Sequence, residues 1–388
     1  MFFALGVFLA AYLLYVALSA IWYIFFHPLR HIPGPKSWIV FPISWHISSI
    51  RGRLHLDMRA FHVKYGEAVR YGPTHVSFIT PQAWNDIYRQ LPKAPSPALN
   101  KSDIIGANDI DHARFRKSLS RAFSAKGLQA QEPLIASYVD KLIGRLKGFA
   151  EAKIPVDMIK WYNLTTFDLI GDLAFGEPFG GLETSEYHHW VSNTFESIKA
   201  SPWMVAICSY PLVFKAIYTF MPKTLLEAQE KQAERARMTV HKRLHNPPAH
   251  DRGDFMDSML RNRGEKDGLT DHELVTNSNI LIIAGSETTA TLLSGVTYWL
   301  LRTPETLRKA TREVRSTMKT EADISFNHVT SQLPYMLACL DEALRLYPPI
   351  PLGLPRIALT PTYISGYEIT PGVSLPNTKW RKKNKLSK

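Results

Sequence analysis

The chain has 388 residues, of which 45% are hydrophobic and 21% charged, so it can bury a large core and is not a disordered protein. A formal net charge of +12 suits an anionic membrane, nucleic acid or an acidic protein partner, but neither zinc-finger spacing nor a basic-aromatic repeat points to nucleic acid. The two cysteines, Cys208 and Cys339, are too few for a disulfide framework and fit a reducing compartment.

The first 26 residues carry no charge and are long enough to span a bilayer, which takes about 20 apolar residues. Aromatic side chains gather at the end of this run, and Arg30 and Lys36 follow it, so the downstream side should be cytoplasmic. A cleaved secretory signal or a buried helix is the alternative, although the run lacks a basic start and is longer than a signal core. We expect a single membrane anchor over residues 1–26.

Turn and strand signals mark a small β part at both ends of the remaining chain. Residues 68–79 read as two β-rich runs about a Gly-Pro turn, and residues 356–370 return to strand-like alternation. Thr80 followed by Pro81 is typical of a helix start, and residues 111–320 have a mainly helical pattern. The sequence therefore predicts a helix-rich α+β fold.

One long helix is the best-marked element. Thr270 and Glu273 form a capping-box pattern, the apolar repeat continues to Leu301, and Pro304 stops it. These bounds predict about 30 residues, or about 45 Å of helix at 1.5 Å per residue, which is enough to cross a whole domain.

Within this helix, residues 284–291 read AGSETTAT, a polar interruption of an apolar pattern. They are either tolerated polar residues, whose threonines hydrogen-bond to the carbonyl one turn earlier, or a functional groove. In the second interpretation Gly285 allows close packing, and a hydroxyl of Thr288 or Thr289 bends the helix. Glu287 then supplies an acid beside the hydroxyl, and such an acid–alcohol pair can relay protons.

Two further stretches allow both a structural and a functional interpretation. Glu342 and Arg345 lie three residues apart on a helix bounded by prolines, and form either a solvated surface pair or a buried pair that needs further partners. His112 and Arg116 lie four apart in a basic helix, which is either a solvated face or a site for carboxylates or an acidic partner. The sequence has no phosphate loop, dinucleotide fingerprint, serine elbow or zinc-protease helix, and its histidines lack metal-ligand spacing.

Taken in order, the apolar start, Pro-Gly-Pro at 33–35, the basic helix, AGSETT, Glu-x-x-Arg and the Pro-Arg of residues 355–356 resemble a microsomal cytochrome P450 monooxygenase. The likeness is nearest to the fungal enzymes that oxidise secondary metabolites, and it extends to about residue 372. It implies the cytochrome P450 fold, with residues 1–26 as the transmembrane anchor and residues 27–372 as the catalytic domain.

The resemblance implies that the chain binds haem b and that AGSETT is the site of oxygen activation. Ala284 and Gly285 would form part of the oxygen-binding groove of the long helix. Glu287 and Thr288 would relay protons there, which would explain the polar interruption of the apolar pattern.

The same resemblance assigns the two charged stretches. His112 and Arg116, together with Arg356, would contact the haem propionates, although the family more often has Trp where His112 stands. Glu342 and Arg345 would form the structural pair that holds the core behind the haem.

The resemblance also implies partners and a location. The protein would be a single-pass protein of the endoplasmic reticulum membrane with a cytoplasmic body, and would receive electrons from NADPH through a reductase docked near the basic helix. It would hydroxylate or epoxidise a lipophilic small molecule, with substrate contacts from residues 95–110, 198–222 and 350–355.

One feature departs from the family, which takes its axial haem ligand from a cysteine in a glycine-rich loop near the C-terminus. No cysteine follows Cys339, which lies on the helix of the Glu-x-x-Arg pair, and Cys208 lies in a variable region, so neither is expected to ligate the iron and no metal ligand is assigned. We therefore expect the chain to lack the haem-ligand loop and the last helix, to end in an aberrant basic tail over residues 373–388, and to be inactive and poorly stable as written.

Three interpretations of this departure stay open. The chain is an incomplete sequence of a working enzyme, a truncated protein that is anchored but inactive, or a membrane-tethered, non-catalytic binding protein that keeps the fold. The intact AGSETT stretch disfavours the third, because a binding protein has no chemical need for an acid–alcohol pair.

Overall fold

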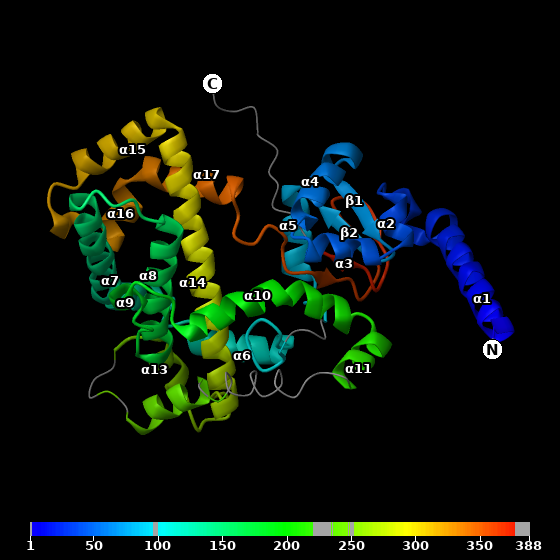
Figure 1. Ribbon diagram of the computed structural model, residues 1–388, viewed down its shortest axis with the longest axis horizontal. Coiled ribbons are helices and arrows are strands. Elements are labelled where there is room, and N and C mark those ends of the chain that lie inside the picture. Colours follow the sequence, from blue (N-terminus) through cyan, green and yellow to red (C-terminus); the bar gives the residue numbers. More distant parts are fainter. Residues whose placement is uncertain are drawn as a thin grey trace. The chain divides into compact units, whose positions relative to one another are not determined.

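The computed structural model describes residues 2–95, 100–219, 234, 236–246, 248 and 252–376, most of which are helical (Figure 1). The chain divides into two compact units, which are described separately. Unit 1 contains residues 1–98, 200–211 and 350–388, and unit 2 contains residues 99–199 and 212–349. The helix-rich character that the sequence predicts is confirmed.

A small β part in unit 1 combines strands from both ends of the chain. Its strands are β1 (Ala68–Gly72), β2 (His75–Phe78), β3 (Arg356–Ile357), β4 (Thr362–Ile364), β5 (Tyr367–Ile369) and β6 (Ser374–Leu375). The first four-stranded sheet has the order β1-β2-β6-β3, and β4 pairs with β5 in a second sheet. β1 and β2 form the antiparallel hairpin predicted from the sequence, while β6 runs parallel to β2.

Strand β6 lies beyond residue 372, where the sequence analysis placed the end of the domain. Ser374 pairs with His75 of β2, and Leu375 pairs with Arg356 of β3. At least these two residues are therefore part of the sheet instead of the expected tail. The remainder of that tail, residues 377–388, lies outside the described residues.

The helices of unit 1 precede and follow the β1–β2 hairpin. They are α1 (Phe2–Ile21), η1 (Trp22–Phe26), η2 (Pro28–His31), α2 (Lys36–Val40), α3 (Ile43–Ile50), α4 (Leu54–Tyr65) and α5 (Pro81–Gln90). Thr80 caps α5 as predicted, because its hydroxyl accepts the backbone N–H of Ala83 at 3.2 Å. Apolar side chains from the hairpin, α5 and the last strands, including Val76, Phe78 and Ile87, form the core of this unit.

A buried arginine joins the N-terminal helices to the hairpin. Arg70 of β1 is 1% exposed, and its guanidinium donates to the carbonyl oxygens of Tyr23 and Pro73, each at 2.8 Å. Burial lowers the pKa of Arg70 to about 10. The C-terminal end of the apolar segment is therefore fixed to the sheet of the same unit.

Unit 2 is helical. Its elements are α6 (Asp109–Leu119), α7 (Ala125–Glu151), α8 (Met158–Phe175), α9 (Gly181–Thr184), α13 (Phe255–Leu260), α14 (Asp271–Arg302), α15 (Pro304–Thr317), η3 (Glu321–Asp323), α16 (Phe326–Gln332) and α17 (Pro334–Leu346). Helix α10 (His189–Cys208) begins in unit 2 and ends in unit 1, and α11 (Pro211–Thr219) begins at the next boundary.

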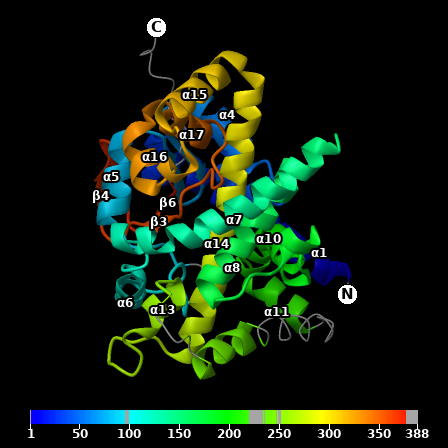
Figure 2. The same cartoon turned by 90° about the vertical axis from the view of Figure 1, so that its left-hand side faces the viewer.

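Helix α14 is the long helix that the sequence predicts. Thr270 and Glu273 form the capping box, and Pro304 begins the next helix after α14 ends at Arg302. α14 packs along α8, which is buried over most of its length (Figure 2). Phe167 and Ile170 of α8 and Leu274 and Ile282 of α14 belong to the main core of the unit.

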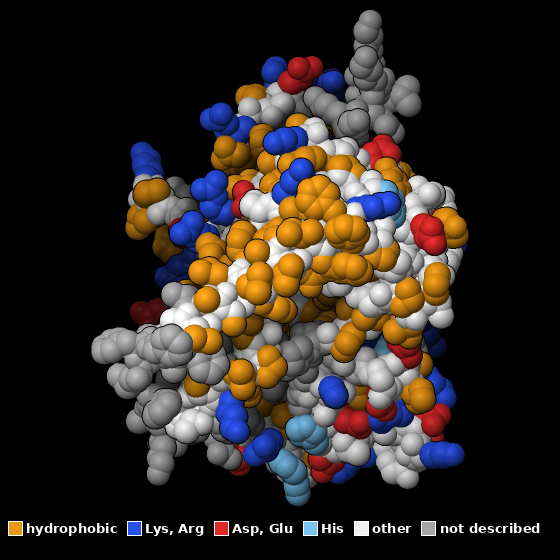
Figure 3. Space-filling view, turned by 90° about the vertical axis from the view of Figure 1, so that its right-hand side faces the viewer, with side chains coloured by type: hydrophobic (Ala, Val, Ile, Leu, Met, Phe, Trp, Pro, Cys, Tyr) orange, Lys and Arg blue, Asp and Glu red, His pale blue; other side chains and the backbone are white. Residues whose placement is uncertain are grey.

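Two apolar stretches, α14 and the segment Leu13–Phe26, can be compared with the membrane anchor expected over residues 1–26. By length and composition, α14 is the one described helix that could cross a membrane, but it is a core helix of unit 2. The segment from Leu13 to Phe26 is apolar but shorter. Large hydrophobic side chains are exposed along it and on α3, and the face in Figure 3 carries a broad field of such side chains.

Candidate functional site

The AGSETT stretch forms an open face in the middle of α14. Thr288 donates its hydroxyl hydrogen to the carbonyl oxygen of Ala284, one turn earlier, at 2.5 Å. Ala284 is exposed and Thr288 is half-buried, and the two share a face because they lie four residues apart. The helix remains α-helical through this stretch. The polar residues therefore compete for a backbone acceptor without ending the helix.

Glu287 precedes Thr288 on α14 and points about 100° away from it around the helix axis. Its Oε2 atom is buried, and no side chain or backbone group in the described part of the chain hydrogen-bonds to it. Burial raises the pKa of this carboxyl, because a charged carboxylate without a partner is poorly solvated there. The Glu287 carboxyl therefore holds a proton more readily than an ordinary glutamate does.

Gly285 lies where α14 packs against α8, unlike the exposed Ala284 that precedes it. A Cβ atom at Gly285 would lie 2.6 Å from Cδ1 of Ile170, so the missing side chain lets α8 approach α14. The close packing that the sequence predicts for this glycine is therefore packing against α8. Since successive helix residues are about 100° apart, Gly285 points away from the centre of the face that Ala284 and Thr288 share.

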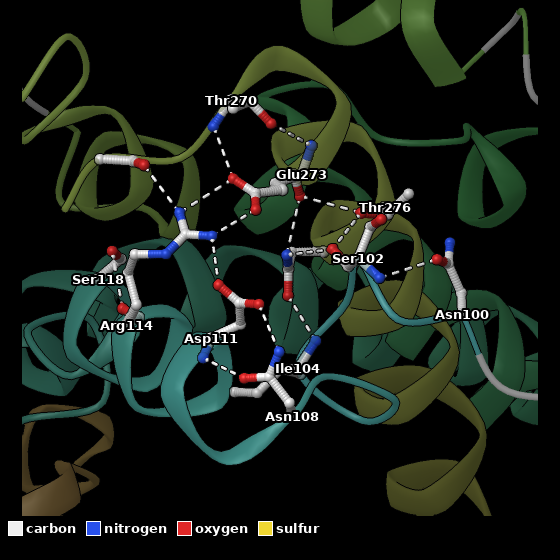
Figure 4. A network of polar contacts seen from close by, with 12 residues as sticks. Asn100, Ser102, Ile104, Asn108, Asp111, Arg114, Ser118, Thr270, Glu273 and Thr276 are labelled. Carbon is white, nitrogen blue, oxygen red and sulfur yellow. Dashed lines mark hydrogen bonds and ion pairs between the residues drawn. The ribbon is translucent and has the colours of Figure 1, made fainter. Parts of the chain in front are cut away.

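Arg114 of α6 makes several polar contacts, and no sequence pattern singled it out. Arg114 binds both carboxylate oxygens of Glu273, and also reaches Asp111 at 3.0 Å and the carbonyl of Gly268 at 2.8 Å (Figure 4). Burial opposes ionisation of Glu273, but the hydrogen bonds from Arg114 prevail and lower its pKa. Arg114 thereby joins α6 to the capping box of α14.

The predicted residues His112 and Arg116 are four residues apart and share one side of α6, which is roughly opposite to that of Arg114. His112 is half-buried and Arg116 is exposed at the end of the helix. Arg116 is accessible to an anion, whereas Arg114 is already paired with carboxylates. The spacing rule that selected residues 112 and 116 could not reveal Arg114, because its partner Glu273 lies 159 residues away.

Arg356 belongs to unit 1, on strand β3. Its guanidinium carbon lies 5.2 Å from the ring centre of Tyr88. Its Nη1 atom is buried, and the described residues provide no hydrogen-bond acceptor for it. A buried donor without an acceptor is costly, so this atom suits an anionic group that completes the site.

Glu342 and Arg345 form two parallel hydrogen bonds on α17, each 2.6 Å long. The side chain of Glu342 is 54% exposed and that of Arg345 29%. The pair thus has the fork geometry of a strong interaction but is partly solvated, which weakens it. Ala343 is the buried residue of α17, so the other apolar side chains of this helix are at most partly covered.

The surroundings of Cys339 do not favour a thiolate. Cys339 is half-buried on α17, and burial followed by the nearby carboxylate of Glu313 raises the pKa of its thiol. Cys208 is the last residue of α10. In the described ranges, no three His, Cys, Asp or Glu side chains form a group that could hold a metal ion. Within unit 1 the buried Nη1 atom of Arg356 suits a haem propionate, whereas Cys339 does not provide an axial thiolate.

Comparison with known proteins gives a consistent family assignment. The cytochrome P450 family profile matches residues 32–376. Cytochrome P450 monooxygenase olcB of Penicillium canescens is 56% identical over 368 residues, which cover 94% of this chain and 75% of that protein. Trichothecene C-4 hydroxylase of Trichoderma arundinaceum is 55% identical over 372 residues, covering 94% and 73% respectively. The open face of α14 thus lies in a chain that is similar to fungal monooxygenases over most of the chain's length. The chain belongs to the cytochrome P450 family.

Proposed function

We propose that the protein is a monooxygenase of fungal secondary metabolism that hydroxylates a lipophilic small molecule at the open face of α14. One observation carries the proposal: the Thr288 hydroxyl lies on that face, bonded to Ala284, with the buried Glu287 carboxyl next to it. Two relatives that share more than half of their aligned residues with this chain support it, and one of them is named as a hydroxylase.

Haem, when bound, supplies the reductive activation of dioxygen. The chain's own residues would control protons and water around it. Glu287 holds a proton more readily than an ordinary glutamate because of burial, and we propose that the Thr288 hydroxyl receives this proton and donates it onward. The exposed methyl of Ala284 leaves the face open to a small ligand.

Basic residues would hold the haem carboxylates. Arg356 offers a buried Nη1 donor without an acceptor among the described residues, and Arg116 offers an exposed guanidinium. A propionate at Arg356 would satisfy an atom that is otherwise costly to bury. His112 would contribute an imidazole donor from the same helix as Arg116.

We further propose that neither Cys208 nor Cys339 is an axial ligand. A haem-thiolate centre needs a deprotonated sulfur, whereas the surroundings of Cys339 favour the neutral thiol. The 388 residues on their own are then expected to support no steady turnover. Glu342 and Arg345 are proposed to stabilise the segment that ends α17.

The location and partners are part of the same proposal. The apolar segment that ends with the exposed aromatic residues of η1 would anchor the protein in the endoplasmic reticulum membrane, with the body in the cytoplasm. The exposed basic side chain of Lys117 on α6 would face an acidic, NADPH-dependent reductase. Residues 95–110, 198–222 and 350–355 would contact the substrate; of these, positions 96–99 and 220–222 lie outside the described residues.

The test is the absorbance spectrum of reduced, carbon-monoxide-treated membranes that contain residues 1–388, followed by haemin titration of the purified chain. We expect haemin to bind without a haem-thiolate band. A thiolate band would contradict the assignment of the cysteines, and Cys339→Ser and Cys208→Ser would then identify the ligand. Failure of haemin to bind at all would remove the basis for a monooxygenase. The trichothecene core without its C-4 hydroxyl is the first ligand whose binding should be measured, given the name of the Trichoderma relative.

A further inference from the structure

Helix α15 and its two ends carry a concentration of positive charge. Residues 302–319 contain six basic and two acidic side chains, hence a net charge of +4, which is a third of the +12 of the whole chain. Arg308, Arg312 and Arg315 are four and three residues apart, so they share one face of the helix along about 10 Å of its axis. All three residues are exposed, and together they are called the arginine stripe.

The described residues provide no carboxylate partner for the arginine stripe. Several other arginines of unit 2 each bind a carboxylate, namely Arg114, Arg243, Arg252 and Arg263. In contrast, no described carboxylate lies within ion-pair distance of the three guanidinium groups of the stripe. Arg308 has only a long hydrogen bond from its Nε atom to the carbonyl oxygen of Pro304, at 3.3 Å. The positive charge of the stripe is therefore available to a partner.

The two acidic residues of α15 serve other groups. The carboxylate of Glu313 accepts the backbone N–H groups of Tyr335 and Met336, at 2.9 and 2.8 Å. These N–H groups belong to the first turn of α17, where the helix dipole stabilises a negative charge. Glu305 lies 3.7 Å from Lys309, which is outside the stripe. Neither carboxylate neutralises the stripe.

The arginine stripe also works against the stability of α15, because like charges spaced by about one helical turn repel each other. The opposite face holds the helix in place, with Ala310 buried and Leu307 and Val314 half-buried where α15 packs on α14 and α17. The three arginines contribute nothing to this packing. A row of repelling charges without a role inside the fold suits a ligand outside it.

The stripe and the basic side chain of α6 lie toward opposite ends of α14. Arg114 of α6 bonds to Glu273 in the first turn of α14, whereas α15 begins after its last residue, Arg302 (Figures 1 and 2). The 32 residues of α14 span about 48 Å at 1.5 Å per residue. A weak electron-transfer contact covers under about 600 Å² of each partner, which does not reach across that length. A protein docked at α6 thus leaves the stripe free.

The chemistry of the stripe favours carboxylates on a protein over a membrane or a nucleic acid. Guanidinium groups stay charged and match carboxylates in geometry. A basic helix that binds a membrane surface buries its apolar face in the lipid, but the apolar face of α15 packs on α17. Proteins that bind single-stranded nucleic acid add aromatic side chains for stacking, and α15 contains none.

We propose that the arginine stripe of α15 docks an acidic α-helix of a second protein, distinct from the partner that would deliver electrons at α6. Glutamates three and four residues apart on that helix would face the three arginines in register, as charged side chains do between neighbouring helices. Exposed ion pairs are individually weak, so the contact is transient and sensitive to salt.

The first experiment measures the affinity of the full 388-residue chain for an alanine-based peptide of about 20 residues, long enough to form a helix, by fluorescence anisotropy. In the spaced peptide the glutamates recur every three and four residues, and a scrambled peptide has the same composition. The wild type should prefer the spaced peptide. The combined variant Arg308→Gln, Arg312→Gln and Arg315→Gln should bind it about tenfold more weakly, as for the loss of three exposed ion pairs.

A matched variant separates the stripe from the net charge of the chain. Arg51→Gln, Arg89→Gln and Lys147→Gln together remove the same charge from exposed positions on other helices or their ends. They should change the affinity for the spaced peptide by less than about twofold at about 0.1 M salt, where charges more than about 10 Å away are screened. Equal losses in the two combined variants would overturn the proposal.

Urea unfolding shows whether the stripe variant is folded. Its midpoint should equal or exceed that of the wild type, because the substitutions remove repulsion from an exposed face. If the combined variant does not fold, Arg312→Gln alone is compared with Arg51→Gln, and only Arg312→Gln should weaken binding of the spaced peptide.

The remaining outcomes test the class of partner and the place where it binds. Equal affinity of the wild type for the spaced and scrambled peptides would refute a helical partner. Tighter, stripe-dependent binding to a DNA duplex, or to vesicles of equal parts phosphatidylcholine and phosphatidylserine, would refute an acidic protein. Lys117→Gln on α6 should leave binding of the spaced peptide unchanged, and a loss as large as that of the stripe variant would contradict a second, separate surface.

Discussion

Gly285 of α14 lies against Ile170 of α8, so closely that a Cβ atom on the glycine would come within 2.6 Å of the isoleucine Cδ1. The polar AGSETT stretch thus has two sides. One side, with Ala284 and Thr288, is open, and the other is in tight contact with the most buried helix of the unit. The same short stretch thus carries the candidate site and packs against the core.

This contact predicts a difference between two glycines of one helix. Gly285→Ala should lower the free energy of unfolding by about 1–2 kcal/mol, because overpacking costs about 1–3 kcal/mol and exceeds the gain of up to about 1 kcal/mol in helix propensity. Gly295→Ala should be neutral or stabilising, since its nearest neighbour is the 56% exposed ring of Tyr347 at 3.2 Å. Urea unfolding measures both. The prediction fails if the two variants are equally stable, or if Ile170→Val does not offset the loss in Gly285→Ala.

Glu287 should cost stability at neutral pH. Its folded pKa is raised above the ordinary value of 4.5, so the folded state binds a proton more readily than the unfolded state, and stability falls as pH rises through the folded pKa. Glu287→Gln has no such dependence. Its advantage over the wild type in urea unfolding should therefore be absent below pH 4.5 and grow toward neutral pH. Exposed Glu151→Gln is the control, and equal advantages at both pH values would contradict the burial of the Glu287 carboxyl.

Glu273 should show the opposite dependence. The hydrogen bonds from Arg114 lower its folded pKa below 4.5, so its contribution to stability is present above that pH and is lost as pH falls through the folded pKa. Glu273→Gln keeps a capping-box side chain but loses the charge, and should cost about 1.5–3 kcal/mol at pH 7.

The comparison with an exposed pair isolates this effect. Glu305 lies 3.7 Å from Lys309 on α15, and both side chains are more than half exposed, so Glu305→Gln should cost little at any pH. If the cost of Glu273→Gln persisted unchanged below pH 4, the ion pair with Arg114 would not be its cause.

Arg356 should matter for haemin and little for stability. Because its Nη1 atom has no acceptor among the described residues, Arg356→Leu removes a buried donor that the folded chain does not satisfy. Unfolding free energy should change by less than about 1 kcal/mol, whereas haemin affinity should fall about tenfold, as for the loss of one charge-assisted hydrogen bond. Titration monitored at the Soret band measures the affinity, with exposed Arg53→Leu as the control. An unchanged affinity would remove Arg356 from the haem site.

Local patterns gave the most reliable sequence predictions. The Thr80 cap of α5, the capping box of α14 and the hairpin over residues 68–79 depend on residues within a few positions of each other, and all three are confirmed. The hydrogen bond of Thr288 to the preceding turn is equally local. Such features follow from backbone geometry that neighbouring residues determine.

Contacts between distant segments were not predictable in the same way. Arg114 and Glu273, or Ser102 and Asn277, are paired by the packing of α6 and its preceding loop on α14, and no spacing in one sequence encodes that packing. Asn277 in particular occupies an ordinary position in an apolar helix, where a polar residue without a known partner looks like a tolerated exception. The division of the chain into two units, with the ends and residues 200–211 in one of them, has the same origin.

The guanidinium of Arg70 has a practical consequence for work with this protein. It takes its acceptors from Pro73 and from Tyr23, and Tyr23 belongs to the apolar N-terminal segment. A shortened version that starts after residue 26 would leave a 1% exposed charge short of one acceptor inside the sheet. A deletion that keeps residue 23, or one combined with an uncharged residue at position 70, should give the more soluble protein.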